Sequence, residues 1–495
     1  MKKKKRGMAI VASSVLAMSL LGFSTSVHTS ASTQTVSKNY LIAYSQSLPK
    51  NYLAEIKSAG GEVVRAMPEV GGVEVRSSNP NFLSQLKSSG TIVAANTERD
   101  YKLEDGNPEG ADGQSVDIKK DADGTYWSSQ WDIRHLTSEG KSFALESGGT
   151  KTTDGKVAHK AVVGVIDSGI DAGHPDLAAN FIGGKNFVPK GGYYGDVPGE
   201  QGITTDVTDT NGHGTHVAGS IAGNGSIKGV GPNLGIRAYR IFDASGSAPT
   251  SPIVAAIVQA ANDGVDVINM SIGGFDNLKY YVDGTRYSDI ADLLLWKRAV
   301  RYAVNKNVTV VASAGNDSLN YADKKSLTDY LNVNYGGDSV VFKGVTVDVP
   351  GAVPGVITVA SSNMWSTNKL AFYSNYGNSF IDVAAPGGDN GPKYDATRIL
   401  GDRDFTYRAL STWPRYLPKY FTMVDNKGYA YLHGTSMASP KVAGIAGVIK
   451  AAHPDYTPAQ VKALIEKTAL DYGKVGHDEL FGSGEANAYS ALTDK

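Results

Sequence analysis

Four runs of consecutive apolar residues constrain the fold of this 495-residue chain more than any other feature. They read A-V-V-G-V-I-D at 161–167, V-D-V-I-N-M-S at 265–271, V-T-V-V-A-S at 308–313 and V-I-T-V-A-S at 356–361. Strands that lack a polar face are covered on both sides, which is typical of parallel sheets. We therefore predict an α/β domain over 127–495, a doubly wound and mostly parallel sheet with helices on both faces.

The segments between these runs carry helix start and stop signals. Pro252 is expected to open a helix that Gly264 ends, and Thr457 with Pro458 opens the last helix. Sheets of this kind gather ligand and catalytic groups at the carboxyl ends of their strands. The polar residues that follow the apolar runs are therefore the first candidates for a functional site.

A smaller unit precedes the large domain. From Tyr40 to Asn96 the hydrophobic period alternates in the order strand, helix, strand, strand, helix, strand. This order predicts a small α+β domain with a ferredoxin-like fold within residues 32–101. Residues 102–126, which follow it, are acidic, Gly-rich and almost free of large apolar side chains, so we expect an exposed linker that is open to proteolytic processing.

The first 31 residues have the layout of a secretory signal peptide, with a basic start, an apolar stretch and a small-residue exit at Ala31. The apolar stretch, from Gly7 to Phe23, is too short for a permanent membrane anchor, so we expect a secreted protein, with cell-wall association left open. Without the five basic side chains of the signal, 43 basic and 49 acidic side chains remain, a formal charge of −6 that does not point to nucleic acid. The absence of cysteine excludes disulfides and thiolate chemistry.

Three polar side chains stand in contexts that suit nucleophilic catalysis. Asp167 ends the first apolar run, His213 lies in N-G-H-G-T-H-V-A-G, and Ser436 lies in G-T-S-M-A-S-P-K-V-A-G. A serine hydroxyl needs a base that removes its proton, and the base needs an acceptor on its other ring nitrogen. Asn316 follows another apolar run and could donate to an oxyanion. Each residue alone also has a structural interpretation, as a cap, turn or packing residue.

The two histidines of the second motif, His213 and His216, also raise the possibility of a metal site. A zinc site would need a third ligand and typically a four-residue spacing with Glu between the histidines. The spacing of three and the lack of a neighbouring ligand favour a general base at His213 and a structural role for His216.

The segments V-I-D-S-G-I, G-H-G-T-H-V-A-G, A-G-N and G-T-S-M-A-S-P-K-V-A-G resemble, in this order, the catalytic segments of the subtilisin-like serine proteases, the subtilases. Subtilisin itself is the protein from which this order of acid, base and nucleophile is known. The resemblance covers most of 127–495 and implies that Asp167 orients the base His213, that Ser436 is the nucleophile and that Asn316 is the oxyanion donor. It also implies that 32–101 is an inhibitory propeptide of an autoprocessed zymogen, which assists folding and is then cut off.

The resemblance further suggests residues that bind the substrate. One strand would accept the substrate backbone and a second segment would line the pocket for the residue before the cut; the less favoured alternative is that both are ordinary core strands. These residues are Ser271, Ile272, Gly273, Ala312, Ser313, Ala314 and Gly315.

The sequence departs from the family pattern around the family's strong calcium site. Residues 223–232 are shorter than the loop that binds this ion, whereas Asp176 matches the acidic ligand or serves as a turn cap. A structural calcium ion is therefore left open, and no cofactor is expected for the chemistry.

Two insertions, 317–350 and 388–431, separate Asn316 from Ser436, and the second is rich in aromatic residues and arginine. Aromatic loops near a site favour recognition of a particular partner, or else they cover the core. With Lys441 where many degradative members have His, the insertions resemble the subtilases that remove leader peptides from lantibiotic precursors. We expect a monomeric serine endopeptidase that acts on a peptide or protein substrate, in dedicated maturation or in general degradation. The rival hypothesis is a binding protein of the same fold that has lost turnover.

Overall fold

The structure is a computed structural model that describes residues 37–86, 90–103, 116, 118–153, 156–417, 423–424 and 428–494. The predicted signal peptide and most of the acidic part of the linker lie outside the described residues. Among the residues described, no helix is long and apolar enough to cross a membrane.

The large domain is built on a seven-stranded sheet in which every neighbouring pair is parallel. The sheet order is β20-β19-β16-β12-β8-β10-β9. The strands are β8 (Val162–Asp167), β9 (Phe181–Asn186), β10 (Gly235–Arg240), β12 (Val267–Met270), β16 (Thr309–Ser313), β19 (Val356–Ser362) and β20 (Val383–Pro386). All four apolar runs form strands of this sheet, and β12, β16 and β19 are buried along their whole length. The predicted α/β fold is thus confirmed.

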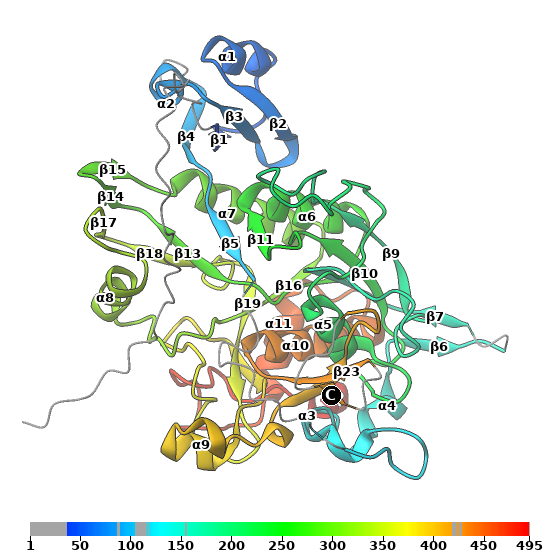
Figure 1. The fold of residues 1–495 in the computed structure, drawn as a ribbon. Coiled ribbons are helices and arrows are strands. Elements are labelled where there is room, and N and C mark those ends of the chain that lie inside the picture. Colours follow the sequence, from blue (N-terminus) through cyan, green and yellow to red (C-terminus); the bar gives the residue numbers. More distant parts are fainter. Residues whose placement is uncertain are drawn as a thin grey trace, which may run out of the picture. The chain divides into compact units, whose positions relative to one another are not determined.

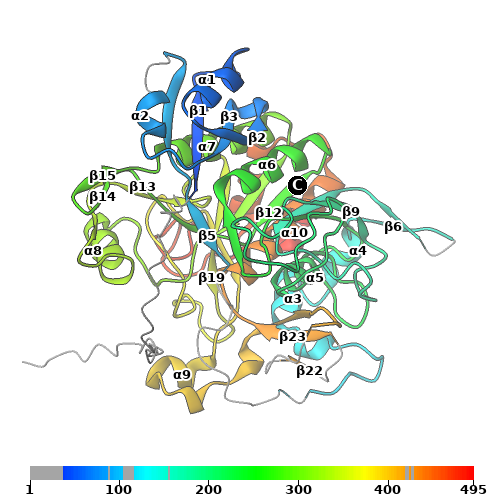
Figure 2. The same cartoon turned by 45° about the horizontal axis from the view of Figure 1, so that its top comes forward.

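Helices cover both faces of this sheet (Figures 1 and 2). Alternate residues of β8 belong to two separate hydrophobic clusters: Val163 and Val165 pack with α5, α10 and α11, whereas Ile166 packs with α6 and α7. The helices are α5 (His213–Ala222), α6 (Thr250–Asn262), α7 (Ile290–Asn305), α10 (Thr435–Ala452) and α11 (Pro458–Thr468). Thr457 caps α11 as predicted, with a full capping box, but this is not the last helix, because the short helix α12 follows at Ala488–Thr493. Helix α6 begins two residues before Pro252, because Pro is compatible with the whole first turn of a helix and does not mark its first residue alone.

The small unit is a four-stranded antiparallel sheet with two helices, in the order β2-β3-β1-β4. Its elements are β1 (Lys38–Tyr44), α1 (Tyr52–Ser58), β2 (Glu62–Met67), η1 (Pro68–Val70), β3 (Gly72–Ser77), α2 (Phe82–Leu86) and β4 (Ile92–Thr97). The order of the two helices and four strands along the chain is the one predicted, and it agrees with a ferredoxin-like fold. The predicted boundary at 101/102 falls inside the next strand, β5 (Asp100–Lys102).

Shorter elements occupy the connections and the two insertions. Around the main sheet lie η2 (Trp127–Ser129), α3 (Trp131–Leu136), α4 (Lys141–Leu145), β6 (Gly149–Lys151), β7 (Val157–His159), β11 (Ser247–Pro249), β13 (Gly274–Asn277), β14 (Tyr280–Val282), β15 (Thr285–Tyr287) and α12 (Ala488–Thr493). The first insertion contains α8 (Lys324–Asn334), β17 (Val340–Phe342) and β18 (Thr346–Val349). The second contains α9 (Gly391–Thr397), η3 (Leu400–Asp402), η4 (Phe405–Tyr407), β21 (Ala409–Thr412), β22 (Met423–Val424) and β23 (Tyr429–Leu432).

The aromatic residues of the second insertion are mostly in the core. Those described as buried are Tyr394, Phe405, Trp413, Tyr429 and Tyr431. Strands β21 and β23 lie against α5, where Ser411 Oγ donates to the carbonyl of His216 and Thr412 Oγ1 donates to that of Thr215. For these residues, covering the core is therefore the correct interpretation, whereas Tyr416 is half exposed.

Candidate active site

The first predicted site residues, Asp167 and His213, form a hydrogen-bonded pair. Asp167 is the last residue of β8 and is fully buried, and His213 is the first residue of α5. The distance between His213 Nδ1 and Asp167 Oδ1 is 2.8 Å. A carboxylate on Nδ1 fixes the ring orientation and the tautomer that leaves Nε2 as a proton acceptor.

A second carboxylate, Asp209, holds the start of α5 against the end of β8. Its oxygens accept the backbone N–H groups of Gly212 and Thr215 at 2.8 and 2.9 Å. Ser168 Oγ donates to Asp209 and accepts the N–H of Gly214, and both contacts are 2.9 Å. Asp209 is not among the predicted site residues, although an acidic residue shortly before a helix start is a recognisable capping signal.

Ser436 lies in the first turn of α10 and is bonded to the end of β12. Its Oγ donates to the carbonyl of Ser271 at 3.2 Å, and Ser271 Oγ donates to the carbonyl of Ser436 at 2.8 Å. Ser271 Oγ also lies 2.9 Å from Ser439 Oγ, one turn further along α10. The structure therefore brings the predicted nucleophile next to the first residue of the predicted substrate strand.

Asn316 follows β16 and contacts the same turn of α10. Its Oδ1 accepts from both the backbone N–H and the hydroxyl of Thr435, each at 2.9 Å. Because the side-chain oxygen faces Thr435, the amide nitrogen is the group of Asn316 that can donate to a bound oxyanion.

The pair Asp167 and His213 lies at the same end of the strands as Ser436 and Asn316. β8, β12 and β16 are parallel neighbours, so Asp167, Ser271 and Asn316 follow the same ends of adjacent strands. Helices α5 and α10, which carry His213 and Ser436, pack in one hydrophobic cluster and lie side by side in Figure 1.

The remaining predicted substrate residues lie close to these groups. Ser313 Oγ donates to the carbonyl of Ile272 at 3.2 Å, which links the two predicted walls. Ile272 and Ala312 share a core cluster with α6 and α7, Ala314 belongs to a neighbouring cluster, and Gly273 is partly exposed. Gly315 takes a φ of +92° and donates its N–H to Thr435 Oγ1 at 3.1 Å.

His216 is buried inside the fold. Its Nε2 lies 3.2 and 3.1 Å from the carbonyls of Ala409 and Ala430, to which it donates. Burial, together with the nearby positive charge of Lys441, lowers the pKa of His216 to about 3, so the ring stays neutral. This is the structural role predicted for it.

The residues around Asp176 do not fit a calcium ion. Asp176 Oδ2 already accepts the backbone N–H of Ile227 at 2.9 Å. The ammonium group of Lys228 lies 3.1 Å from Asn224 Oδ1 in the same loop, so a positive side chain is present where calcium would need oxygen ligands alone. Within the described part of the chain, no cluster of three or more His, Asp or Glu side chains could hold a metal.

Comparison with known proteins agrees with this geometry. The model of the Subtilase family matches residues 158–484. The nisin leader peptide-processing serine protease NisP of Lactococcus lactis subsp. lactis is 34% identical over 375 residues, which cover 75% of this chain and 51% of that protein. The chain thus spans about half the length of that relative. The epidermin leader peptide-processing serine protease EpiP of Staphylococcus epidermidis is 29% identical over 471 residues, which cover 92% and 93% of the two chains.

Solved structures of the same kinds of protein also match this chain. The crystal structure of EpiP from Staphylococcus aureus matches with a TM-score of 0.73 and 27% identity over 93% of this chain and 99% of that chain. The structure of NisP from Lactococcus lactis matches with a TM-score of 0.63 and 30% identity over 75% of this chain and 96% of that chain. With its parallel sheet, its Asp167–His213 pair and a family match that covers about two thirds of its length, the chain belongs to the subtilase family of serine proteases.

Proposed function

We propose that this protein is a secreted serine endopeptidase, made as a zymogen, that cuts peptide bonds through an acyl-enzyme on Ser436. The observation that carries the proposal is the buried Asp167–His213 pair at the ends of the strands where Ser436 lies in the first turn of α10. Residues 1–31 would direct export, and the mature enzyme would act as a monomer without a cofactor.

The reaction follows from the roles of these groups. Ser436 Oγ attacks the scissile carbonyl carbon while His213 Nε2 takes its proton, and Asp167 stabilises the imidazolium that forms. The oxyanion accepts hydrogen bonds from Asn316 Nδ2 and from the backbone N–H of Ser436. The imidazolium then gives its proton to the leaving amine, the C–N bond breaks, and an ester remains on Ser436. Water hydrolyses this ester by the same steps.

The substrate is proposed to be the leader peptide of a lantibiotic-type precursor. The support is that two relatives similar to this chain carry names that describe leader peptide-processing proteases, and that one of them aligns over nearly the whole chain. A general degradative protease is the second candidate, since subtilisins are also among the relatives. Cleavage of a lantibiotic precursor without digestion of unfolded casein would separate the two.

The small unit is proposed to be the propeptide. It supplies side chains to the amino-terminal ends of two peptidase helices: Glu98 accepts the N–H of Ser251 in α6 at 2.7 Å, and Asn96 accepts the N–H of Ala291 in α7 at 2.7 Å. These caps satisfy helix donors that otherwise lack partners, which would assist folding of the peptidase domain.

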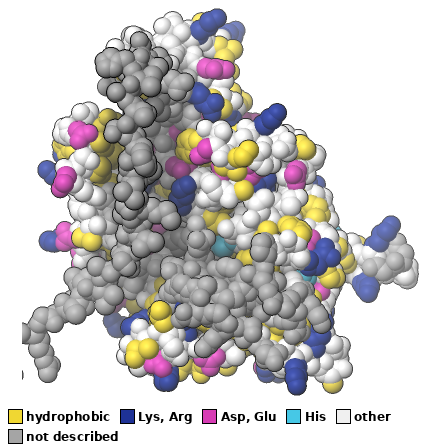
Figure 3. Space-filling view, in the orientation of Figure 1, with side chains coloured by type: hydrophobic (Ala, Val, Ile, Leu, Met, Phe, Trp, Pro, Cys, Tyr) yellow, Lys and Arg dark blue, Asp and Glu magenta, His cyan; other side chains and the backbone are white. Residues whose placement is uncertain are grey.

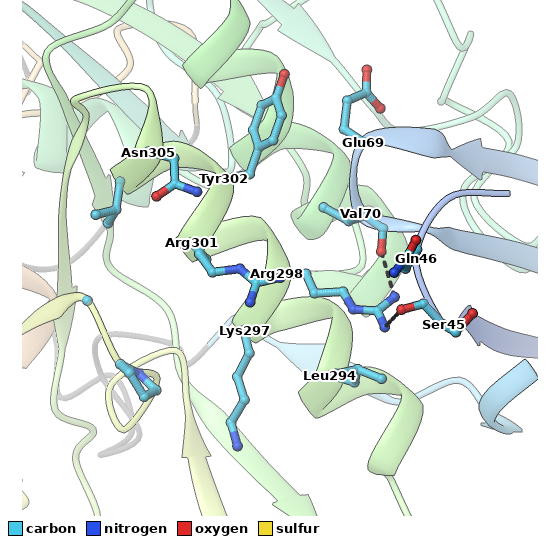
Figure 4. A pocket seen from close by; sticks show the side chains of 13 residues that line it. Ser45, Gln46, Glu69, Val70, Leu294, Lys297, Arg298, Arg301, Tyr302 and Asn305 are labelled. Carbon is cyan, nitrogen blue, oxygen red and sulfur yellow. Dashed lines mark hydrogen bonds between the residues drawn. The ribbon is translucent and has the colours of Figure 1, made fainter.

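A further contact joins the small unit to the side of α7. In Figure 4, the guanidinium of Arg298 points at the small unit and donates to the carbonyls of Val70 and Ser45, at 2.9 and 3.4 Å. The pocket beside this contact has a volume of about 880 Å³ and is lined by both units. On the face shown in Figure 3, the basic and acidic side chains of the described residues are interspersed, which does not favour a nucleic-acid partner.

Intact mass spectrometry of wild type beside Ser436→Ala tests the proposal. Wild type is expected to lose the small unit, and the variant is expected to keep it. A serine-directed phosphonate should label Ser436 in wild type and should fail to label His213→Ala. Loss of the small unit from the variant in a protease-free host would refute self-processing, and tight peptide binding without cleavage by wild type would favour the binding protein.

A further inference from the structure

The pocket at the junction of the small unit and α7 has the size of a small-molecule site (Figure 4). Its volume is about 880 Å³. Gln46 and Glu69 of the small unit line one side of it, and α7 lines another side between Leu294 and Asn305. The pocket is therefore complete only while the small unit is joined to the peptidase domain.

Three basic side chains of α7 line this pocket. Lys297, Arg298 and Arg301 are one, three and four residues apart, so they share one side of the helix. Among the described residues that line the pocket, Glu69 is the sole carboxylate, and in Figure 4 its carboxyl group points away from both guanidinium groups. Arg298 donates to two backbone carbonyls of the small unit, which carry no formal charge. The residues that line the pocket therefore leave it with a net positive charge.

The two guanidinium groups repel each other at this spacing. Burial, followed by the positive charge of Arg301, lowers the pKa of Arg298. Like charges that face each other on a helix surface are unfavourable. A bound anion would relieve this repulsion, because it would place negative charge beside both groups.

The donors around the pocket suit phosphate or carboxylate groups. A guanidinium presents its N–H groups as a planar fork that can bind two oxygens of such a group at once. The side-chain amides of Gln46 and Asn305, one from each unit, add neutral N–H donors. Two guanidinium groups and one ammonium group exceed the charge of a single carboxylate, so the pocket favours a ligand with more than one anionic group.

We infer that this pocket binds a small soluble polyanion, with two or more phosphate or carboxylate groups, in the unprocessed protein. The anion contacts Arg298 and Arg301 of the peptidase domain and Gln46 of the small unit. A ligand that binds only the joined form stabilises that form by mass action, so the anion holds the small unit in place and slows its release. The binding site goes beyond the proposed function, and only its effect on maturation rests on that function.

Calorimetry on Ser436→Ala that keeps the small unit tests the binding, with pyrophosphate and citrate as the probes. At constant ionic strength, at least one of them is expected to bind at one site per chain. Arg301→Gln in the same background should weaken this binding about tenfold, because the anion loses a charged hydrogen-bond donor. The same affinity in this variant would overturn the inference, as would the absence of binding by both probes.

Arg286→Gln is the matched control, because it removes an equal charge from an exposed arginine of β15 that does not line the pocket. Its affinity for the probe should stay at the Ser436→Ala value. Both probes also chelate cations, but this effect is the same in the two variants. An equal loss of affinity in Arg286→Gln would indicate a general effect of charge and would overturn the site.

Vesicles that contain phosphatidylglycerol separate a soluble ligand from a lipid headgroup. Ser436→Ala should bind pyrophosphate or citrate in free solution and should not need the vesicles. Binding to the vesicles without binding of either soluble probe would assign the basic side chains to a membrane surface and would overturn the inference.

The effect on maturation is measured separately, with wild type. At ten times its Kd, the probe should slow release of the small unit about tenfold, and Arg301→Gln in an otherwise wild-type chain should remove this delay. Release at an unchanged rate with the probe bound would overturn the claim that the anion holds the small unit. If wild type never loses the small unit, the zymogen proposal fails, whereas calorimetry still decides whether the pocket binds the anion.

Discussion

The two largest sheets of the described residues differ in how their faces are covered. In the seven-stranded sheet, both faces are covered by helices of the peptidase domain itself. In the small sheet, successive residues of β1 belong to different cores: Ile42 packs with the unit's own helices, whereas Leu41 and Ala43 pack in the cluster of α6 and α7. The small sheet therefore uses the peptidase domain as its second covering layer.

This difference shows that the small sheet depends on the peptidase domain, whereas the catalytic pair does not depend on the small unit. A domain of about 60 residues buries too little surface to be very stable alone, so the shared face contributes much of what holds the small sheet. The catalytic pair depends instead on peptidase groups, since Asp209 and Ser168 fix the start of α5. The site can therefore outlast the small unit, which is what the proposed zymogen requires.

The largest expected effect concerns the peptidase domain's own fold. Lys441 Nζ lies 2.8 Å from Asp132 Oδ2, and both side chains are at most 1% exposed, which ties α3 to the helix of Ser436. Lys441→Met leaves a buried carboxylate without its cation and should lower the unfolding free energy by about 3–5 kcal/mol. Denaturant unfolding in a Ser436→Ala background measures this.

The matched control for Lys441 is an exposed ion pair. Lys467 lies 2.7 Å from Asp494 at the surface, and Lys467→Met should cost less than about 1 kcal/mol. Equal losses in the two variants would show that the buried pair does not hold the peptidase domain together.

The next largest effect concerns the catalytic site, which the peptidase domain forms without the small unit. Asn316→Ala should lower kcat about 10²- to 10³-fold, a magnitude established on subtilisin itself, because the oxyanion loses a donor. Thr435→Val removes the hydroxyl that donates to Asn316 Oδ1 and accepts the N–H of Gly315, but it keeps the Asn316 amide nitrogen, so it should lower kcat far less. Steady-state kinetics on one peptide substrate compare the two, and equal losses would assign Asn316 to positioning α10.

The two faces of β1 can be separated by a matched pair of variants. Leu41→Ala and Ile42→Ala each remove a fully buried side chain and should destabilise the small unit by about 2–5 kcal/mol. Hydrogen exchange in the Ser436→Ala background is the measurement. Ile42→Ala should speed exchange in the small unit alone, whereas Leu41→Ala should also speed it in α7, around Leu295. The same pattern for both variants would contradict the shared core.

The smallest effect is a dependence on pH at the contact between the units. Burial, followed by the charge of Asp289, raises the pKa of Asp292 to about 6, and its carboxyl accepts from Asn96 Nδ2 and from the N–H of Arg99. Burial likewise raises the pKa of the neighbouring carboxyls, Glu98, Asp276 and Asp289, among which Arg99 is the nearby cation.

The sign follows from the direction of these shifts. A carboxyl whose pKa is raised by folding contributes stability below its ordinary pKa, near 4, and this contribution is lost as the pH rises through about 6. After correction for intrinsic rates, β1 should exchange faster at pH 7 than at pH 5 in full-length Ser436→Ala, while β8 should change less. Slower exchange of β1 at pH 7 would contradict this prediction.

The second insertion shows what could not be predicted from the sequence. Its aromatic residues suggest a recognition surface when they are read along the chain, yet Trp413 packs beside Gly212, where a Cβ would lie 2.4 Å from the indole ring. The composition of a loop does not say which side chains find a partner in the core. That depends on a contact with α5, some 200 residues away in sequence.

The sequence by itself determined the layered α/β architecture and the candidate catalytic residues, because both follow from patterns of neighbouring residues. Apolar runs without a polar face require covered strands, and a serine, a histidine and an aspartate in their motifs follow strand ends or open helices. The tertiary structure alone decided the strand order, the role of Asp209 and the second covering layer of the small sheet. Each of these joins residues that are distant in sequence, and such pairings follow from packing and hydrogen bonding in three dimensions, which local periodicity does not specify.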